Sequence, residues 1–172
     1  MKYGIAYFPS KQIQDEVNSY RKRYDSHYAL IPPHLTLKES FTADDAEIES
    51  LIPELKKIAN ETDPFNITIN KVSSFAPISN TIYLKINPSP ELQTLFDKLH
   101  SGKFSDDADH PFVPHITLAQ DLVDQEYSDV FGSLKMKKYD LGDEVDRFQL
   151  LYQLDNGSWT VYETFVFGKE FV

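Results

Sequence analysis

The chain contains no cysteine among its 172 residues. That absence excludes disulfides, thiol nucleophiles, cysteine-ligated zinc and iron–sulfur clusters. Only six glycines are present, and they form neither a GxGxxG dinucleotide motif nor a P-loop. No apolar run approaches the roughly 20 residues of a membrane helix, and the short run in residues 1–12 is too small for a signal peptide. We therefore expect a cytoplasmic protein with no membrane partner.

Positive charge is also scarce, because 17 Lys and Arg face 27 Asp and Glu, for a net charge of −10. Such a surface repels extended nucleic acid, which is therefore a poor default partner. A small phosphate ligand in a locally neutral or basic cleft stays compatible with this charge. Apolar residues make up 41% of the chain, so its length and composition suit one domain, or two small lobes that share a core.

The sequence repeats one pentapeptide, as "PHLTL" at residues 33–37 and "PHITL" at residues 114–118. The flanks match too, because "FPSKQIQDEVNSY" and "NPSPELQTLFDKL" both place Pro-Ser before an amphipathic helix. We interpret this as a unit of about half the chain that has been duplicated. The resulting prediction is an α+β fold with a single domain over residues 1–172. Two pseudo-symmetric lobes are expected to surround a central cleft, and to contain two mostly antiparallel sheets flanked by helices.

Local patterns place the repeats on strands. Alternating apolar residues predict strands, and apolar stripes at helical spacing predict helices. Pro53 lies inside the second predicted helix and indicates a kink or a late start after Thr42, and "DNGS" at residues 155–158 predicts a hairpin turn. The expected strands cover residues 2–8, 34–41, 65–77, 81–86, 115–121, 145–154 and 159–168, and the expected helices start near residues 10, 42, 89 and 124, the last ending near residue 138.

Residues two apart on a strand share a face, so His34 lies beside Thr36 and His115 beside Thr117. If an approximate two-fold axis relates the lobes, both His/Thr faces can meet across one cleft. A neutral imidazole can then take a proton from a nucleophile while an imidazolium gives one to a leaving oxygen. The two hydroxyls can hold phosphate oxygens. This pattern suggests phosphodiester cleavage without a required metal.

A single His-x-Thr on a strand is usually structural, and function is favoured here by two matched copies in a chain with five histidines. His27, His100 and His110 are expected on the surface. A metal site built on the two motif histidines is conceivable, but no spacing typical of metal ligands supports it, so no metal is expected.

Three further side chains could line the cleft. Lys38 has the strand parity of His34, so it should point into the cleft, where it could neutralise phosphate. Phe75 could stack on a base or pack in the core, and Tyr152 in "LYQL" is a further candidate. Gln120, by parity, should point away from the cleft unless a bulge intervenes.

Two H-x-[ST] motifs, each followed by an apolar residue, resemble the signature of the two-histidine (2H) phosphoesterase superfamily, which includes LigT-like proteins. "HYALIPPHLTL", "FVPH" and "DRFQLLYQLDNGSWTVYETF" extend the likeness over nearly the whole chain. The resemblance implies a bilobal fold with both motifs in its cleft and no cofactor. It also implies hydrolysis of a small 2′,3′-cyclic or 2′–5′ linked nucleotide phosphodiester, with His34 and His115 as acid and base and Thr36 and Thr117 on the phosphate.

Several alternatives stay open at this point. The same cleft would serve a non-catalytic module that binds nucleotides or RNA ends, or an RNA ligase-like transferase. RNA ends are therefore also candidate partners beside a small nucleotide. The sequence determines neither the oligomeric state nor which histidine is the base, because the two motifs are nearly equivalent.

Overall fold

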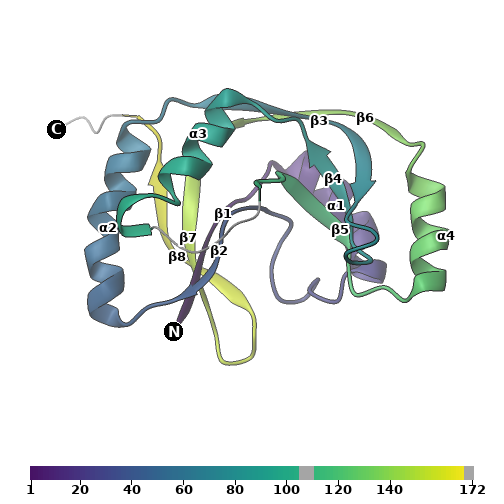
Figure 1. Cartoon of the computed structure of the whole chain (residues 1–172), viewed down its shortest axis with the longest axis horizontal. Helices are drawn as coiled ribbons and strands as arrows, with labels where there is room; N and C mark the ends of the chain where they lie inside the picture. The colour runs from purple at the N-terminus through teal and green to yellow at the C-terminus, as the bar shows by residue number, and fades with distance from the viewer. Residues whose placement is uncertain (105–110, 169–172) are drawn as a thin grey trace.

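The computed structural model describes residues 1–104 and 111–168 (Figure 1). Helices are interspersed with strands and strand hairpins along the chain, as expected for an α+β protein. In chain order the elements are β1 (Lys2–Tyr7), α1 (Lys11–Tyr24), β2 (Leu35–Thr42), α2 (Asp45–Asn60), β3 (Phe65–Ser74), β4 (Ile82–Ile86), α3 (Pro90–Lys98), a short 3-10 helix (Gly102–Phe104), β5 (His115–Ala119), α4 (Asp124–Leu134), β6 (Lys138–Val145), β7 (Arg147–Gln153) and β8 (Trp159–Val166).

The described strands form one eight-stranded sheet in the order β6-β3-β4-β5-β2-β1-β7-β8. Every pair of neighbouring strands is antiparallel. The α+β class with antiparallel pairing is confirmed, and the expected two sheets are corrected to one. The two four-stranded halves are joined where the two motif strands meet, through a single residue pair, Leu35 with Ile116.

The halves of the sheet are not the halves of the sequence. Strands β7 and β8, from the end of the chain, lie beside β1 and β2 from its beginning. Helix α1 follows β1 but packs against β5 in the other half of the sheet, whereas α2 packs against β8. The chain therefore crosses between the halves repeatedly, and neither half of the sequence can form its part of the sheet alone.

The helices gather at two ends of the molecule. Helices α2 and α3 lie toward the end of the molecule that holds β7 and β8, and α1 and α4 lie toward the other end (Figure 1). An ion pair of 3.9 Å between Lys98 and Glu61 links α3 to the end of α2, and Tyr127 of α4 shares a 2.7 Å hydrogen bond with Ser74 of β3. Among the described residues, no helix is long and apolar enough to cross a membrane.

Helix α1 begins beside a carboxylate from the other half of the sheet. Ser10 is its N-cap, but the Ser10 side chain makes no capping bond. Asp143 of β6 accepts hydrogen bonds from the backbone N–H of Ser10 at 2.8 Å and from the Tyr7 hydroxyl at 2.6 Å. A carboxylate at a helix N-terminus is stabilising because it faces unpaired N–H groups and the positive end of the helix dipole.

Strand β6 was missing from the sequence-based prediction. The helix expected to reach residue 138 ends at Leu134, and Lys138–Val145 forms an edge strand. Its side chains alternate between exposed and half-buried up to the buried Val145. Charged residues and Gly142 weaken the strand signal, and such residues are tolerated at an edge because one side of the strand meets water.

Helix α2 is capped by Asp44 rather than by Thr42, and it starts well before Pro53, so the late start that the proline suggested is wrong. It begins at Asp45 behind a capping box, in which Asp44 accepts from the Glu47 backbone at 2.8 Å and Glu47 accepts from the Asp44 backbone at 3.2 Å. Pro53 lies inside the helix with its side chain exposed. The helix continues through this residue to Asn60, so tertiary packing outweighs the local cost of the proline.

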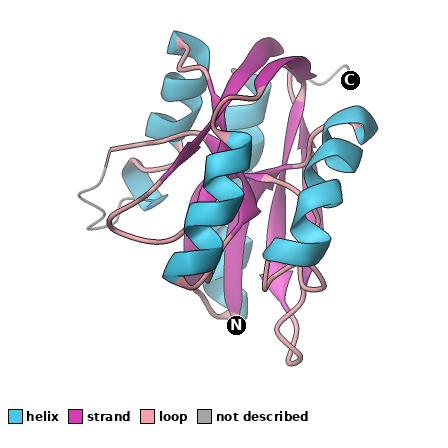
Figure 2. Cartoon of the chain, turned by 90° about the vertical axis from the view of Figure 1, so that its right-hand side faces the viewer, coloured by secondary structure: helices cyan, strands magenta, loops and turns pink. Residues whose placement is uncertain are grey.

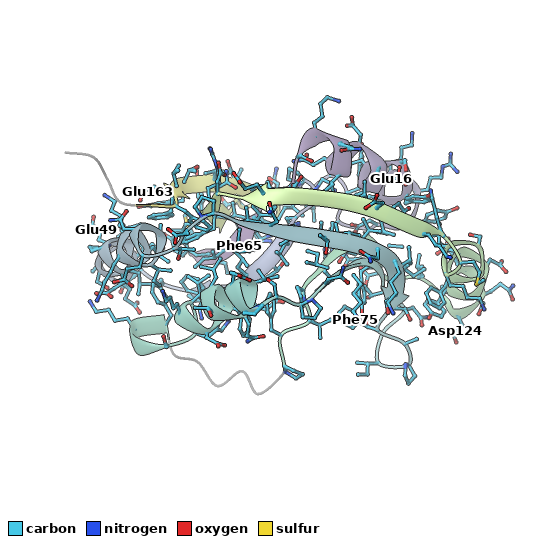
Figure 3. The ribbon with its side chains drawn as sticks, turned by 90° about the horizontal axis from the view of Figure 1, so that it is seen from above. Glu16, Glu49, Phe65, Phe75, Asp124 and Glu163 are labelled. Atoms are coloured by element: carbon cyan, nitrogen blue, oxygen red, sulfur yellow. The ribbon has the colours of Figure 1, made fainter. Side chains whose placement is uncertain are left out.

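Strand β3 runs from the middle of the molecule toward the end that holds α4 (Figure 3). Phe65, at its start, lies near the middle of the molecule in Figure 3, and Phe75, just beyond its end, lies toward Asp124 at the start of α4. The β7–β8 hairpin projects from the body of the protein in Figures 1 and 2. Its turn holds Gly157 at φ 91°, a conformation that glycine adopts without strain, as the "DNGS" signal predicts.

Candidate active site

Both motifs lie where the two halves of the sheet meet. Because Leu35 pairs with Ile116 in an antiparallel register, the residues on either side also face each other. His34 therefore stands opposite Thr117, and Thr36 stands opposite His115. Directly opposed residues have Cβ atoms roughly 4.5–5.5 Å apart, so these four side chains form a compact group on one face of the sheet, which we call the His/Thr group.

The other face of both motif strands is core. Leu35, Leu37, Ile116 and Leu118 are all almost completely inaccessible to solvent, whereas the four residues of the His/Thr group are only partly buried. The alternation predicted from the sequence thus anchors each motif through its aliphatic side chains and leaves the imidazoles and hydroxyls on the accessible face.

The two imidazoles are held in the same way. His34 Nδ1 lies 2.9 Å from the carbonyl oxygen of Pro32, and His115 Nδ1 lies 2.6 Å from that of Val113. A carbonyl oxygen can only accept, so each Nδ1 carries the proton and each neutral ring keeps its lone pair on Nε2. Each Nε2 can then act as a base, or as an acid once it is protonated.

Both imidazoles favour the neutral form. The pKa of His34 is lowered to about 4, mainly because the ring loses contact with solvent. The nearby charges of Arg21 and His115 also lower this pKa, whereas the Pro32 carbonyl and Asp25 raise it. Desolvation also lowers the pKa of His115, although the Val113 carbonyl and Glu39 raise it. The charge of His115 is thus one of the smaller causes that lower the pKa of His34.

Aromatic rings enclose His115. The centre of the Phe75 ring lies 5.0 Å from that of His115 in an edge-on arrangement, and the Tyr83 ring is also 5.0 Å away. Lys85 is the cross-strand neighbour of His115 on β4, and Tyr83 is that of Thr117. Phe75 thus lies next to His115, while Lys85 brings positive charge to this face that the sequence-based analysis did not identify.

Beside His34 the site is open, in contrast to the aromatic rings that enclose His115. A cavity of about 190 Å³ opens beside His34 and Thr36. Outside its lining, the Phe8 ring lies edge-on to the His34 ring, with 6.4 Å between the ring centres. The lining itself combines small or apolar residues with polar ones at the edge, namely Gly4, Ile5, Ala6, His27, Ile31, His34, Thr36, Lys38, Glu39, Ser40, Leu151 and Trp159.

A buried ion pair supports the loop that precedes His34. Arg21 and Asp25 on α1 and its C-cap are joined at 2.8 Å, with side chains only 3% and 2% exposed. The Arg21 guanidinium also donates to the carbonyl oxygens of Ile31 at 2.6 Å and His27 at 3.4 Å. These bonds fix the backbone just ahead of Pro32, whose carbonyl orients the His34 ring.

The same ion pair reaches the second motif. Asp25 accepts from the backbone of His27 and from the side chain of Gln120, both at 2.8 Å. Gln120 follows β5, and its backbone N–H donates to the Tyr24 carbonyl at 3.0 Å. Gln120 thus bonds outside the His/Thr group, and one buried pair connects the loop before His34 to the strand that carries His115.

The remaining candidates lie at different places. Lys38 is part of the cavity lining, and its ammonium group donates to the Phe104 carbonyl at 2.9 Å. Tyr152 is not brought to the cavity: it packs against the core and makes an edge-on contact of 5.9 Å with Tyr162. Its neighbour Leu151 lines the cavity instead.

The other three histidines lie outside the His/Thr group or outside the described residues. The His27 side chain is 51% exposed, at the edge of the cavity. His100 stacks on Phe96 at 3.9 Å between ring centres. His110 lies outside the described residues. In residues 1–104 and 111–168, no group of three or more His, Cys, Asp or Glu side chains could hold a metal ion.

Two larger hollows, and a third of about 290 Å³ that Tyr20 of α1 and Ser133 of α4 help to line, are chemically less suitable. One, of about 300 Å³ near Pro114 and the start of α3, is lined by prolines, apolar side chains, Ser89 and Gln93, without a titratable group. The other, of about 650 Å³, has three carboxylates in its lining, Glu61, Asp63 and Glu91, against Lys98. Of these hollows, the cavity at His34 alone has histidines in its lining, and imidazoles transfer protons near neutral pH.

Comparisons with known proteins identify the family and the fold of this chain. Residues 9–157 match the family model described as the 2'-5' RNA ligase superfamily. A protein from Oceanobacillus iheyensis is 63% identical over 99% of this chain and 100% of its own length, and its name is "Putative phosphoesterase OB1230". A similarly named protein from Bacillus mycoides is 53% identical over 99% of both chains.

Solved structures show the same fold at lower sequence identity. The structure of LigT from E. coli complexed with 3'-AMP matches with a TM-score of 0.73 and 17% identity, over 96% of this chain and 97% of that one. TT0787 of Thermus thermophilus matches with a TM-score of 0.74 and 18% identity, over 99% and 100%. The fold is therefore LigT-like, and the chain belongs to the 2'-5' RNA ligase superfamily of two-histidine phosphoesterases.

Proposed function

We propose that this protein is a metal-independent phosphoesterase that cleaves a small nucleotide phosphodiester, of the 2′,3′-cyclic or 2′–5′ linked type, by acid–base catalysis with His34 and His115. The observation that carries the proposal is the arrangement of the His/Thr group. Two imidazoles on adjacent strands share one accessible face, each with Nδ1 bound to a backbone carbonyl.

In the proposed reaction on a cyclic phosphate, Nε2 of one neutral imidazole takes a proton from water. The water oxygen forms a new bond to phosphorus, and the bond from phosphorus to one ribose oxygen breaks. The second imidazole, as imidazolium, gives its Nε2 proton to that oxygen. The product is a nucleoside 2′- or 3′-phosphate, and the proton balance is restored when the two rings exchange their protons with solvent.

The charges around the site support this division of roles. With both pKa values lowered, the free protein presents neutral imidazoles at pH 7. A bound phosphodiester anion favours a nearby positive charge, so substrate binding raises the pKa of the imidazole that must act as acid. Thr36 and Thr117 can donate to the non-bridging oxygens, and Lys85 beside His115 adds positive charge to the same face.

The decisive experiment compares His34→Ala and His115→Ala on a panel of nucleoside 2′,3′-cyclic phosphates and 2′–5′ dinucleotides. Each variant should lose about 10²–10⁴-fold in kcat, the usual contribution of a positioned acid or base. The double variant should lose little more than either alone, because the two groups act as a unit. His100→Ala is the matched control, since this ring stacks on Phe96 outside the His/Thr group.

Two rival functions use the same cleft. A binding module would bind these nucleotides without turning over any of them. An RNA ligase-like transferase, in line with the family description, would join 2′,3′-cyclic phosphate and 5′-hydroxyl RNA ends. Activity that survives in either histidine variant, or that disappears when a chelator is added, would contradict the proposed mechanism, and strand joining that outpaces hydrolysis would favour the transferase.

A further inference from the structure

The two sides of the His/Thr group differ although the motifs match. In the half of the sheet that holds His115, Tyr83 of β4 is the cross-strand neighbour of Thr117. In the other half, the corresponding neighbour of Thr36 is Ala6 of β1. A phenol ring therefore fills the space on one side, and a methyl group leaves it open on the other. The cavity beside His34 results from this difference.

The cavity extends away from the phosphate side across the sheet. Beyond Ala6, its floor continues to Gly4, whose cross-strand neighbour Leu151 on β7 also lines the cavity. A side-chain carbon added at Gly4 would lie 3.7 Å from the ring of Trp159. The indole thus stands over β1, one strand from β2, and neighbouring strands are roughly 5 Å apart.

Trp159 is held in this position by its backbone. It is the first residue of β8, directly after the turn of the projecting β7–β8 hairpin (Figure 2). Its N–H donates to the Leu30 carbonyl at 2.8 Å, in the same loop that Arg21 ties down through Ile31. The ring is half-buried, so one part packs on the floor while another part faces the cavity.

We propose that this cavity is a nucleobase subsite in which Trp159 is the specificity-determining residue. The inference rests on the proposed function, because it places the phosphate of the substrate on the His/Thr group. Gly4 and Ala6 are two residues apart, a rise of roughly 7 Å along the strand. The ribose would lie over Ala6, and the base would stack against the indole. Leu151 and Ile31 supply the remaining apolar contact.

This subsite selects a class of substrate. A phosphodiester with a base one ribose away from the reacting phosphate gains the stacking contact, whereas a cyclic phosphate without a base does not. Stacking accepts every base because each has a π-face. The expected substrates are therefore nucleoside 2′,3′-cyclic phosphates or 2′–5′ dinucleotides. The protein should discriminate strongly between substrates with and without a base, and only weakly among the four bases.

Kinetics on two substrates test this directly. Trp159→Ala should lower kcat/KM for adenosine 2′,3′-cyclic phosphate by about 5- to 150-fold, the change expected for loss of one base–aromatic stack. It should leave kcat/KM for glycerol 1,2-cyclic phosphate within about threefold, since that substrate carries the ring phosphate without a base. Trp159→Phe should retain most of the activity on adenosine 2′,3′-cyclic phosphate.

The matched control is Tyr162→Ala, on the same strand. Tyr162 contacts Tyr3 and Tyr152 rather than the cavity, so any change should be equal for both substrates. Equal losses on both substrates in Trp159→Ala, or no loss on either, would overturn the subsite.

Trp159 also reports binding without turnover, because it is the only tryptophan in the chain. Adenosine 3′-monophosphate should change the intrinsic fluorescence of the wild-type protein in a saturable way, and inorganic phosphate at the same concentration should not. Binding of the nucleotide that is seen by calorimetry but leaves Trp159 fluorescence unchanged would refute the subsite. If the wild-type protein turns over no substrate, the proposed hydrolase fails, while the fluorescence and calorimetry still decide on the subsite.

Discussion

Replacing Arg21 by methionine tests whether the buried ion pair positions His34. The change keeps most of the side-chain volume but removes the 2.8 Å ion pair to Asp25 and the 2.6 Å hydrogen bond to Ile31. Removing one partner of a buried pair costs about 3–5 kcal/mol. We expect the low end, about 3 kcal/mol, because Asp25 keeps hydrogen bonds from His27 and Gln120.

The same variant should change catalysis in a way that a purely structural residue would not. Arg21 holds the backbone before Pro32, so its loss should misplace the His34 ring and lower kcat/KM by about 10- to 100-fold. Arg21 also lowers the pKa of His34. Removing that positive charge raises this pKa, and the pH at which kcat/KM is maximal should move upward.

Urea unfolding at 25 °C and the pH dependence of kcat/KM measure both effects. Lys11→Met is the matched control, because Lys11 and Asp15 form a pair at the same spacing on the same helix with side chains 87% and 63% exposed. An exposed pair contributes about 0–1 kcal/mol. An Arg21→Met variant that is within 1 kcal/mol of wild type, or that is destabilised with an unchanged pH profile, would refute the positioning role.

Three further predictions concern the His/Thr group. The pKa values of His34 and His115 are both lowered, so kcat/KM, which reports the free protein, should peak below pH 6.5 and fall as pH rises. The maximum of kcat should lie at higher pH, because bound phosphate raises the pKa of the acid. A kcat/KM maximum above pH 7 would contradict this prediction. Unfolded histidines bind protons below about pH 6.5, so the free energy of unfolding should fall as pH drops from 6.5 to 4. The variant His34→Gln should reduce that fall by about 1–2 kcal/mol after allowance for partial exposure. Urea titrations at each pH that coincide for the wild-type protein and the variant would rule this out. Thr36→Val and Thr117→Val should each lower kcat/KM by about 10-fold in steady-state kinetics, since each removes one hydrogen bond to a charged group. The control variant Thr94→Val, on the exposed side of α3, should leave kcat/KM unchanged. Unchanged kcat/KM in both site variants would show that the hydroxyls take no part in the mechanism.

The sequence predicts the local structure of the site well because the motif is written in strand periodicity. Alternation alone placed His34 and Thr36 on one face and Leu35 on the other, and the buried state of Leu35 agrees. The repeat then predicted that the two motifs would meet. The register that sets His34 opposite Thr117 could not be predicted, because it depends on which strands pair, and strand pairing is decided by tertiary contacts.

Residues around the motifs were harder to identify for the same reason. Lys85 and Tyr83 reach the site only as cross-strand neighbours. Arg21 looked like one of several basic residues at the end of a helix, yet it is buried at 2% exposure. Tyr152 was the candidate selected from the sequence, whereas its neighbour Leu151 lines the cavity. An irregularity in the pairing of β7 with β8 next to Leu151 influences which side of the sheet each residue meets.

The arrangement of the sheet also lay beyond local patterns. Duplication suggested two separate sheets, but the two motif strands pair with each other and join the halves. Nothing in the sequence of β7 and β8 shows that they return to lie beside β1, since that placement depends on contacts between the two ends of the chain.

The most direct test of the central claim is the turnover of adenosine 2′,3′-cyclic phosphate by the wild-type protein, His34→Ala and His115→Ala, in the presence of a chelator. We expect product from the wild-type protein and a loss of about 10²–10⁴-fold in each variant, with His100→Ala unchanged. Full activity in either site variant would contradict the claim that the two histidines form one site.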